Sequence, residues 1–113
     1  MPESKRVRVG VNGYGVIGKR VAAAVTLQPD MTLAGVSDVA TDWRARIVNR
    51  NGFPLFGATA EHATAMRHGG LALAGTLDDL LDELDVVVDC TPKRVAAKNI
   101  DLYRRRGLSR ASS

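Results

Sequence analysis

The chain has one cysteine and no long apolar segment. A single cysteine, Cys90, in 113 residues excludes a disulfide framework and is typical of proteins in reducing compartments. No apolar run reaches the roughly 18 residues that a membrane-spanning helix needs. The polar residues 1–6 do not resemble a secretory signal. These absences predict a cytoplasmic protein with no membrane partner.

The net positive charge of the chain comes from its last ten residues. The formal net charge is +4, and four arginines in the last ten residues account for it: Arg104, Arg105, Arg106 and Arg110. Without them, basic and acidic residues are equal in number. Nucleic-acid-binding proteins usually combine a basic patch with aromatic side chains that stack on bases, and aromatics are only 4% here. The sequence therefore predicts no nucleic-acid partner.

Histidine is also scarce, which bears on metal and catalytic sites. His62 and His68 are six residues apart in a predicted helix. That spacing does not place both on one helix face, and no carboxylate-rich set joins them, so we expect surface histidines and no metal site. Cys90 ends an apolar strand without a histidine nearby in sequence. We expect a packed, inert thiol and assign no catalytic residue.

What the chain does have is an alternation of predicted strands and helices. Strands are predicted at 6–12, 31–37, 53–58 and 85–90, and helices at 17–27, 41–48, 61–68, from 76, and at 95–106. Residues 71–75 are left unassigned. The three consecutive valines of "DVVVDC" suit a strand covered on both faces. The alternation predicts an α/β fold with a mostly parallel sheet and helices on both of its faces.

Capping and periodicity refine the helices. An apolar stripe of Ile17, Val21, Ala24 and Val25 is expected on the buried face of the first helix. Thr41 or Asp42 is expected to cap the second helix. Thr76, with Asp79 three residues later, forms a variant of the capping box.

The stretch "NGYGVIGKRV", residues 12–21, places three glycines where a helix begins. Gly13, Gly15 and Gly18 form a G-x-G-x-x-G motif between a predicted strand and a predicted helix. In such motifs the first glycine permits the sharp turn, the second lets a pyrophosphate approach the backbone, and the third allows tight helix packing. The start of the helix offers free N–H groups and partial positive charge to an anion.

An acidic residue follows at the distance that this motif requires. Asp38 lies 20 residues after Gly18, at the end of the second predicted strand, where a carboxylate can accept hydrogen bonds from a ribose diol. The pattern predicts a Rossmann-like, dinucleotide-binding fold; the alternative is a glycine-rich turn beside a surface aspartate. Like-charge repulsion between Asp38 and a 2′-phosphate favours NAD over NADP. NADP use stays open, because Arg44 and Arg46 could neutralise a phosphate.

The residues also resemble a known family. "RVRVGVNGYGVIGKRVAAAV", "FPLFGA" and "LAGTLDDLLDELDVVVDCTPKRVAAKN" are similar to the start of archaeal-type (type II) glyceraldehyde-3-phosphate dehydrogenases, over roughly residues 6–103. The resemblance implies that the backbone of Val16 and Ile17 meets the cofactor. It also implies that Thr91 and Pro92 line the cofactor side of the cleft. The candidate cofactor-binding residues are Asn12, Gly13, Gly15, Val16, Ile17, Gly18, Asp38, Thr91 and Pro92.

The resemblance has further implications for function. It implies the NAD(P)-binding portion of a phosphorylating dehydrogenase that forms homotetramers, with the catalytic cysteine segment in a later domain that this chain lacks. Residues 1–103 would form an NAD(P)-binding domain, incomplete at its C-terminal end, and the basic tail 104–113 is expected to be disordered or out of frame. Two alternatives stay open: a dihydrodipicolinate- or homoserine-type reductase domain, and a free-standing nucleotide-binding module.

Overall fold

Six strands and five helices alternate along the computed structural model, which describes residues 6–39 and 42–112, with side chains through residue 108. The strands are β1 (Val7–Asn12), β2 (Met31–Asp38), β3 (Leu55–Gly57), β4 (Gly75–Thr76), β5 (Val86–Asp89) and β6 (Ser109–Ser112). The helices are α1 (Val16–Thr26), α2 (Trp43–Arg50), α3 (Ala60–His68), α4 (Leu77–Leu81) and α5 (Lys93–Arg105). None of these helices is long and apolar enough to span a bilayer.

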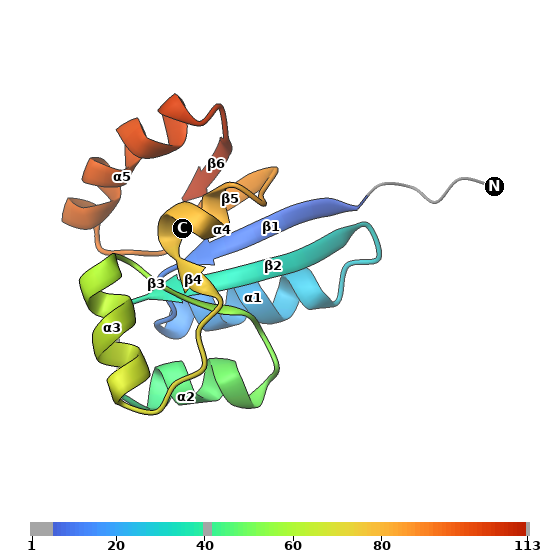
Figure 1. Cartoon of the computed structure of the whole chain (residues 1–113). Helices are drawn as coiled ribbons and strands as arrows, with labels where there is room; N and C mark the ends of the chain where they lie inside the picture. Colours follow the sequence, from blue (N-terminus) through green and yellow to red (C-terminus); the bar gives the residue numbers. More distant parts are fainter. Residues whose placement is uncertain (1–5, 40–41, 113) are drawn as a thin grey trace.

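The strands form one parallel sheet in the order β4-β3-β2-β1-β5-β6. Figure 1 shows α1 and α2 on one side of this sheet and α5 on the other. The predicted α/β fold, Rossmann-like with a parallel sheet and helices on both faces, is confirmed. The unassigned residues 71–75 end in the two-residue edge strand β4.

Each face of the sheet carries its own hydrophobic cluster. The first cluster joins β1, β2 and β3 to α1, α2 and α3, and includes Val11, Val36, Leu55 and Met66. The second joins β2, β3 and β5 to α4 and α5: Ala34, Phe56, Leu77, Leu80, Leu81, Leu84, Val87 and Tyr103. Val87 of β5 is buried in the second cluster, whereas Val86 and Val88 on the other face are only partly buried, so the prediction of a strand covered on both faces is right for one face only.

Helix starts agree with the capping signals. Asp42 is the N-cap of α2, and its Oδ1 accepts a hydrogen bond from the Arg44 backbone N–H at 3.0 Å. Thr41, the other predicted cap, lies outside the described residues. The predicted capping box at α4 is confirmed, with Asp79 Oδ2 accepting from the Thr76 backbone N–H at 2.9 Å.

The predicted apolar stripe of α1 is wrong in part. The buried residues are Gly18, Ala22 and Val25, whereas Ile17 is 53% exposed and Ala24 is also exposed. The helix lies so close to the turn before it that its inner face needs small residues. Close approach, rather than side-chain hydrophobicity, therefore decides which face of α1 is buried.

The tail also differs from its prediction. Residues 109–112 form β6, which pairs in parallel with β5 from Val86↔Ser109 to Asp89↔Ser112. The expectation of a disordered tail is wrong for these residues. They lack an apolar pattern but satisfy the free backbone groups along the β5 edge. A truncated or frame-shifted origin of the tail stays a prediction.

Candidate functional site

The order of the strands reverses direction between β1 and β5. From β1 the chain builds β2, β3 and β4 to one side, then crosses to place β5 and β6 on the other. At the carboxyl ends of the strands, Asn12 of β1 pairs with both Ser37 of β2 and Asp89 of β5. In open α/β sheets, ligands bind outside the carboxyl ends of the strands at such a reversal. The glycine motif, Asp38 and Thr91 all follow strands that end here.

The glycine turn has the backbone geometry that the motif predicts. Gly13 has φ +96° and donates its N–H to the Ser37 carbonyl at 2.7 Å. A side chain at Gly13 would meet the Cys90 carbonyl at 3.0 Å, and a Cβ at Gly18 would lie 1.9 Å from the Gly13 carbonyl oxygen. Only glycine fits at these two positions while the turn keeps this shape.

The second glycine of the motif, Gly15, faces open space at the start of α1. Gly15 is the N-cap residue, no side chain caps the helix, and a Cβ on Gly15 would have no atom within 4 Å. The Lys19 N–H is bonded to the Gly15 carbonyl at 2.9 Å. The backbone N–H groups of Val16, Ile17 and Gly18 therefore precede the first helical hydrogen bond and point out of the helix end. This arrangement suits a bound anion such as a diphosphate.

Asp38 lies against the same turn. The residue is buried, and its Oδ2 accepts from the Tyr14 backbone N–H at 3.3 Å while its Oδ1 accepts from the Val39 N–H at 2.7 Å. Tyr14 inserts its ring into the first hydrophobic cluster, where burial raises the pKa of its phenol and a hydrogen bond to Asn51 opposes that rise. The carboxylate is thus fixed beside the turn by two backbone donors.

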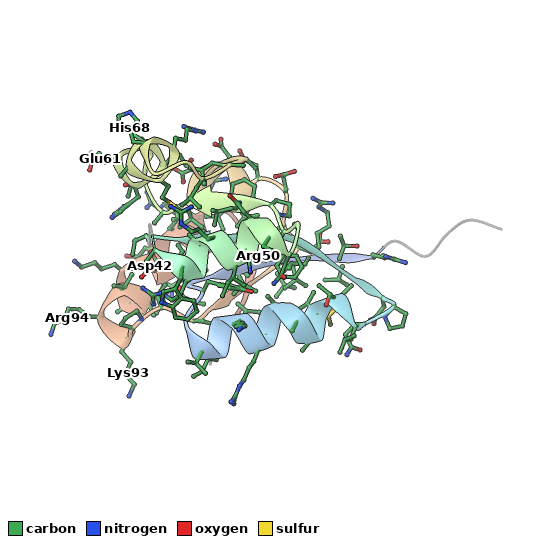
Figure 2. The ribbon with its side chains drawn as sticks, turned by 90° about the horizontal axis from the view of Figure 1, so that it is seen from below. Asp42, Arg50, Glu61, His68, Lys93 and Arg94 are labelled. Carbon is green, nitrogen blue, oxygen red and sulfur yellow. The ribbon has the colours of Figure 1, made fainter. Side chains whose placement is uncertain are left out.

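A groove of about 650 Å³ opens beside the start of α1. Gly15, Val16 and Lys19 form part of one wall, and the start of α2, including Asp42 and Trp43, forms part of the other. Trp43, at the first position of α2, is 63% exposed. Figure 2 shows Asp42 at the same end of the molecule as Lys93 and Arg94, which point outward.

The loop after β5 is held by a buried carboxylate that the sequence did not single out. Asp89, only 3% exposed, accepts at Oδ1 from the Thr91 backbone N–H at 2.9 Å and from the Thr91 hydroxyl. Pro92 follows as the N-cap residue of α5, which starts two residues earlier than expected. The only sequence feature that could have predicted this role is the position of Asp89 directly after three valines, at the end of a buried strand.

Asn12 has side-chain hydrogen-bond partners within the protein. Its side chain is buried, accepts from the Ser37 hydroxyl at 2.9 Å and donates to the Tyr103 hydroxyl at 2.9 Å. These internal bonds use both ends of the amide. The assignment of Asn12 as a cofactor-binding residue stays a prediction.

The remaining candidates lie away from this edge or within the core. His62 bonds to Thr59, with 2.8 Å between Nδ1 and Oγ1, and His68 is exposed at the end of α3. Within the described residues, no group of three or more His, Cys, Asp or Glu side chains could hold a metal ion. Cys90 is partly buried and packs against the first hydrophobic cluster.

Comparison with protein families now supplies a decisive match. Residues 7–110 match the family model described as dihydrodipicolinate reductase, N-terminus. The chain belongs to this family. The match extends past residue 103 into β6, so the family domain includes part of the segment that we expected to be a tail.

Curated relatives in this comparison are glyceraldehyde-3-phosphate dehydrogenases. The protein from Methanothermus fervidus is 44% identical over 100 residues, which are 88% of this chain and 30% of the relative. The protein from Pyrococcus abyssi is 47% identical over 103 residues, 91% of this chain and 31% of the relative. The chain therefore spans about 30% of the length of the curated relatives that it matches.

Solved structures support the fold alone. Scyllo-inositol dehydrogenase from Lactobacillus casei superposes with a TM-score of 0.71 at 16% identity, covering 96% of this chain and 28% of that one. GenD2 from gentamicin A biosynthesis, solved in complex with NAD, has a TM-score of 0.60 at 21% identity and covers 100% of this chain and 37% of its own.

Proposed function

We propose that this chain is the NAD-binding portion of a phosphorylating glyceraldehyde-3-phosphate dehydrogenase, which oxidises glyceraldehyde 3-phosphate to 1,3-bisphosphoglycerate in glycolysis and gluconeogenesis. The observation that carries the proposal is the 43% to 47% identity to enzymes of that name across about nine-tenths of the chain. The glycine turn at the sheet reversal supports its dinucleotide-binding part. We place the full-length protein in the cytoplasm, as a homotetramer.

The residues at the sheet edge fit a dinucleotide. We assign the diphosphate to the backbone N–H groups of Val16, Ile17 and Gly18, where the absent side chain of Gly15 leaves room. Asp38 would accept from a ribose hydroxyl, and the loop of Thr91 and Pro92 would flank the cofactor from the other side of the reversal. When bound, the dinucleotide supplies a hydride acceptor; the chain's own residues bind and orient it.

We propose a preference for NAD over NADP. A 2′-phosphate beside the Asp38 carboxylate meets like charge, which costs about 1 kcal/mol in water and about 4 kcal/mol near a partly shielded surface. The two arginines that could offset this charge have other partners. Arg44 Nε lies 3.4 Å from Asp42 Oδ1, and Arg46 Nη2 donates to the Gly69 carbonyl at 3.2 Å.

We further propose that the isolated chain binds its cofactor without turnover. The resemblance assigns the nucleophilic cysteine, the histidine base and the phosphate-binding residues to a later domain. Nucleophilic catalysis needs an activated thiolate. Cys90 is a poor substitute for that nucleophile, because it is partly buried against the hydrophobic core. No histidine lies near it in the sequence of β5 or α5.

A second candidate follows from the description of the matching family, which names a reductase. Under this reading the chain would be the nucleotide-binding part of a dihydrodipicolinate-type enzyme. The start "NGYG" favours the first candidate, because such reductases usually lack asparagine and tyrosine there. Both residues are integral to this fold: Asn12 bonds to Ser37 and Tyr103, and Tyr14 fills the first hydrophobic cluster.

Titration of the purified chain with NADH and NADPH tests the binding proposal. Trp43 is the only tryptophan and lines the groove beside Gly15, so its emission should fall as NADH binds. A ligand at about 100 times its Kd should add about 2.7 kcal/mol to the free energy of unfolding, seen as a higher Tm. No quenching and no Tm shift with either cofactor would refute dinucleotide binding.

A chimera distinguishes the two enzyme classes. Residues 6–112 would replace the matching part of the Pyrococcus abyssi relative, with the unaltered relative as control. The first candidate predicts phosphate-dependent reduction of NAD with glyceraldehyde 3-phosphate. A folded chimera that binds NADH but shows no such activity would favour the second candidate. Turnover by the 113-residue chain alone would contradict the proposal that it is catalytically incomplete.

A further inference from the structure

A chain of buried polar side chains lies beneath the candidate site. Ser37, Asn12, Tyr103 and Asp89 come from β2, β1, α5 and β5, and all four are buried. The Ser37 hydroxyl donates to Asn12 Oδ1 at 2.9 Å, and Asn12 Nδ2 donates to the Tyr103 oxygen at 2.9 Å. The Tyr103 hydroxyl donates to Asp89 Oδ2 at 2.5 Å. One connected path therefore joins the carboxyl ends of three strands to a helix.

The direction of these hydrogen bonds is fixed by their chemistry. Asp89 Oδ2 accepts from the Tyr103 hydroxyl, which leaves the phenol oxygen free to accept from the Asn12 amide. That orientation leaves Asn12 Oδ1 as the acceptor for Ser37. Burial raises the pKa of the Tyr103 phenol and keeps it a donor. Every donor thus points toward one buried carboxylate, an arrangement in which hydrogen bonds reinforce one another.

The path connects the glycine turn after β1 with the loop after β5. Asn12 immediately precedes Gly13, whose turn leads into α1. At the other end, the second oxygen of Asp89 holds the backbone N–H of Thr91 at 2.9 Å. Tyr103 is the only member of the path on a helix, and its hydroxyl bonds to Asn12 and to Asp89. It therefore contacts both the residue that precedes the glycine turn and the residue that holds the Thr91 loop.

Helix α5 carries a second donor to the same carboxylate. Asn99 Nδ2 donates to Asp89 Oδ2 at 3.1 Å, four residues before Tyr103 and so on the same helix face. Asn99 is only partly buried and has no bond to Asn12 among the described contacts. Asn99 bonds to Asp89 and to the Tyr103 hydroxyl, whereas Tyr103 also bonds to Asn12 and so joins the two sides.

We propose that Tyr103 is a positioning residue of the dinucleotide site. Its hydroxyl sets the separation between the glycine turn and the Thr91 loop through Asn12 and Asp89, although it lies outside the glycine motif. This inference rests on the proposed function. Without the hydroxyl, the Asn12 amide loses its acceptor and Asp89 loses a donor while both stay buried, which drives the two strand ends to relax.

The test compares Tyr103→Phe with a matched control. Phenylalanine keeps the ring in the second hydrophobic cluster and removes only the hydroxyl. The control is Asn49→Ala, because Asn49 makes two 2.9 Å hydrogen bonds to the Ala72 backbone on the α2 side, away from the sheet reversal. Both variants should lower the Tm. Kd for NADH and the quenching of Trp43 at saturating NADH are measured below the Tm of every protein.

Tyr103→Phe should raise the Kd for NADH about tenfold and change the saturating Trp43 quenching. Asn49→Ala should leave both values at those of the wild type. An unchanged Kd in Tyr103→Phe overturns the inference, as does an equal Kd increase in both variants. If Tyr103→Phe does not fold, Asn99→Ala decides: a Kd increase of about threefold supports the inference and an unchanged Kd overturns it. Wild-type protein that fails to bind NADH overturns the proposed function itself.

Discussion

Alanine at Gly15 and alanine at Gly18 should both weaken binding, but only alanine at Gly18 should destabilise the fold. Both glycines belong to the same motif, and both substitutions add one methyl group. A Cβ at Gly18 would lie 1.9 Å from the Gly13 carbonyl oxygen, whereas a Cβ at Gly15 would have no protein atom within 4 Å. The motif therefore contains one glycine that the fold requires and one whose space we assign to a ligand.

Gly18→Ala should destabilise the fold. The methyl group meets backbone that cannot rotate away, and overpacking of this kind costs about 1–3 kcal/mol. Alanine regains about 1 kcal/mol through its higher helix propensity. We expect a net loss of up to about 2 kcal/mol, which lowers the Tm by up to roughly 8 °C in a domain of this size. Binding should weaken as well, because α1 moves away from the turn.

Gly15→Ala should leave the fold nearly unchanged. Its φ of −80° and ψ of −158° suit alanine. The weaker N-cap costs about 0.5–1 kcal/mol, and the lower entropy of the unfolded chain offsets about 0.4–1 kcal/mol of it. The methyl group instead occupies the space where a diphosphate would approach the helix. We expect a Kd for NADH at least about tenfold higher, equivalent to about 1.4 kcal/mol.

Thermal melts and Trp43 quenching by NADH measure the two effects on the same samples. The reasoning requires that Gly15→Ala lose affinity at a Tm within about 2 °C of wild type. If Gly15→Ala binds NADH as tightly as the wild type, the open space at Gly15 is not a diphosphate site. If Gly18→Ala melts at the wild-type temperature, the contact with Gly13 does not constrain the turn.

Three further predictions concern single carboxylates. Asp38→Asn removes the charge facing a 2′-phosphate and should narrow the Kd ratio of NADPH to NADH by about tenfold; an unchanged ratio in paired titrations would contradict the electrostatic argument. The Arg44 backbone N–H lowers the pKa of Asp42, so the stability this carboxylate contributes is present above about pH 4 and is lost as the pH falls through its lowered folded-state value. Asparagine can also cap a helix but does not titrate, so the Tm of Asp42→Asn should fall less steeply than that of the wild type between pH 4 and 2. Parallel Tm curves for the two proteins would exclude a stabilising role for the Asp42 charge. Asp79→Ala removes the acceptor of the Thr76 N–H and should cost about 1 kcal/mol, or roughly 4 °C in Tm, and a melt unchanged from wild type would show that the capping box is not stabilising.

Several features of the site followed from local rules. The conformation of Gly13 and the small size required at Gly18 depend on the turn between a strand and a helix, which the motif specifies by spacing. The position of Asp38 depends only on where β2 ends. These parts were predictable because each is fixed within about 25 residues of chain, by backbone sterics and by the end of a single strand.

Other features depend on contacts between distant segments. The register of β1 and β2 skips Ala34, which therefore faces the second hydrophobic cluster while Val36 faces the first. No alternation of side chains in the sequence marks this irregularity. The exposure of Trp43 likewise depends on how α2 packs against the sheet. The sequence of α2 alone is compatible with either a buried or an exposed tryptophan at this position.

The sequence by itself determined the order of strands and helices, the glycine turn and the acidic residue that faces it, because these arise from local sterics and hydrophobic pattern. Only the tertiary structure decided the inner face of α1, the strand β6 and the link from Asn12 through Tyr103 to Asp89. Close backbone approach, edge pairing through main-chain groups and hydrogen bonds between residues up to 91 positions apart leave no periodic mark in the chain. They exist only once the sheet has brought those segments together.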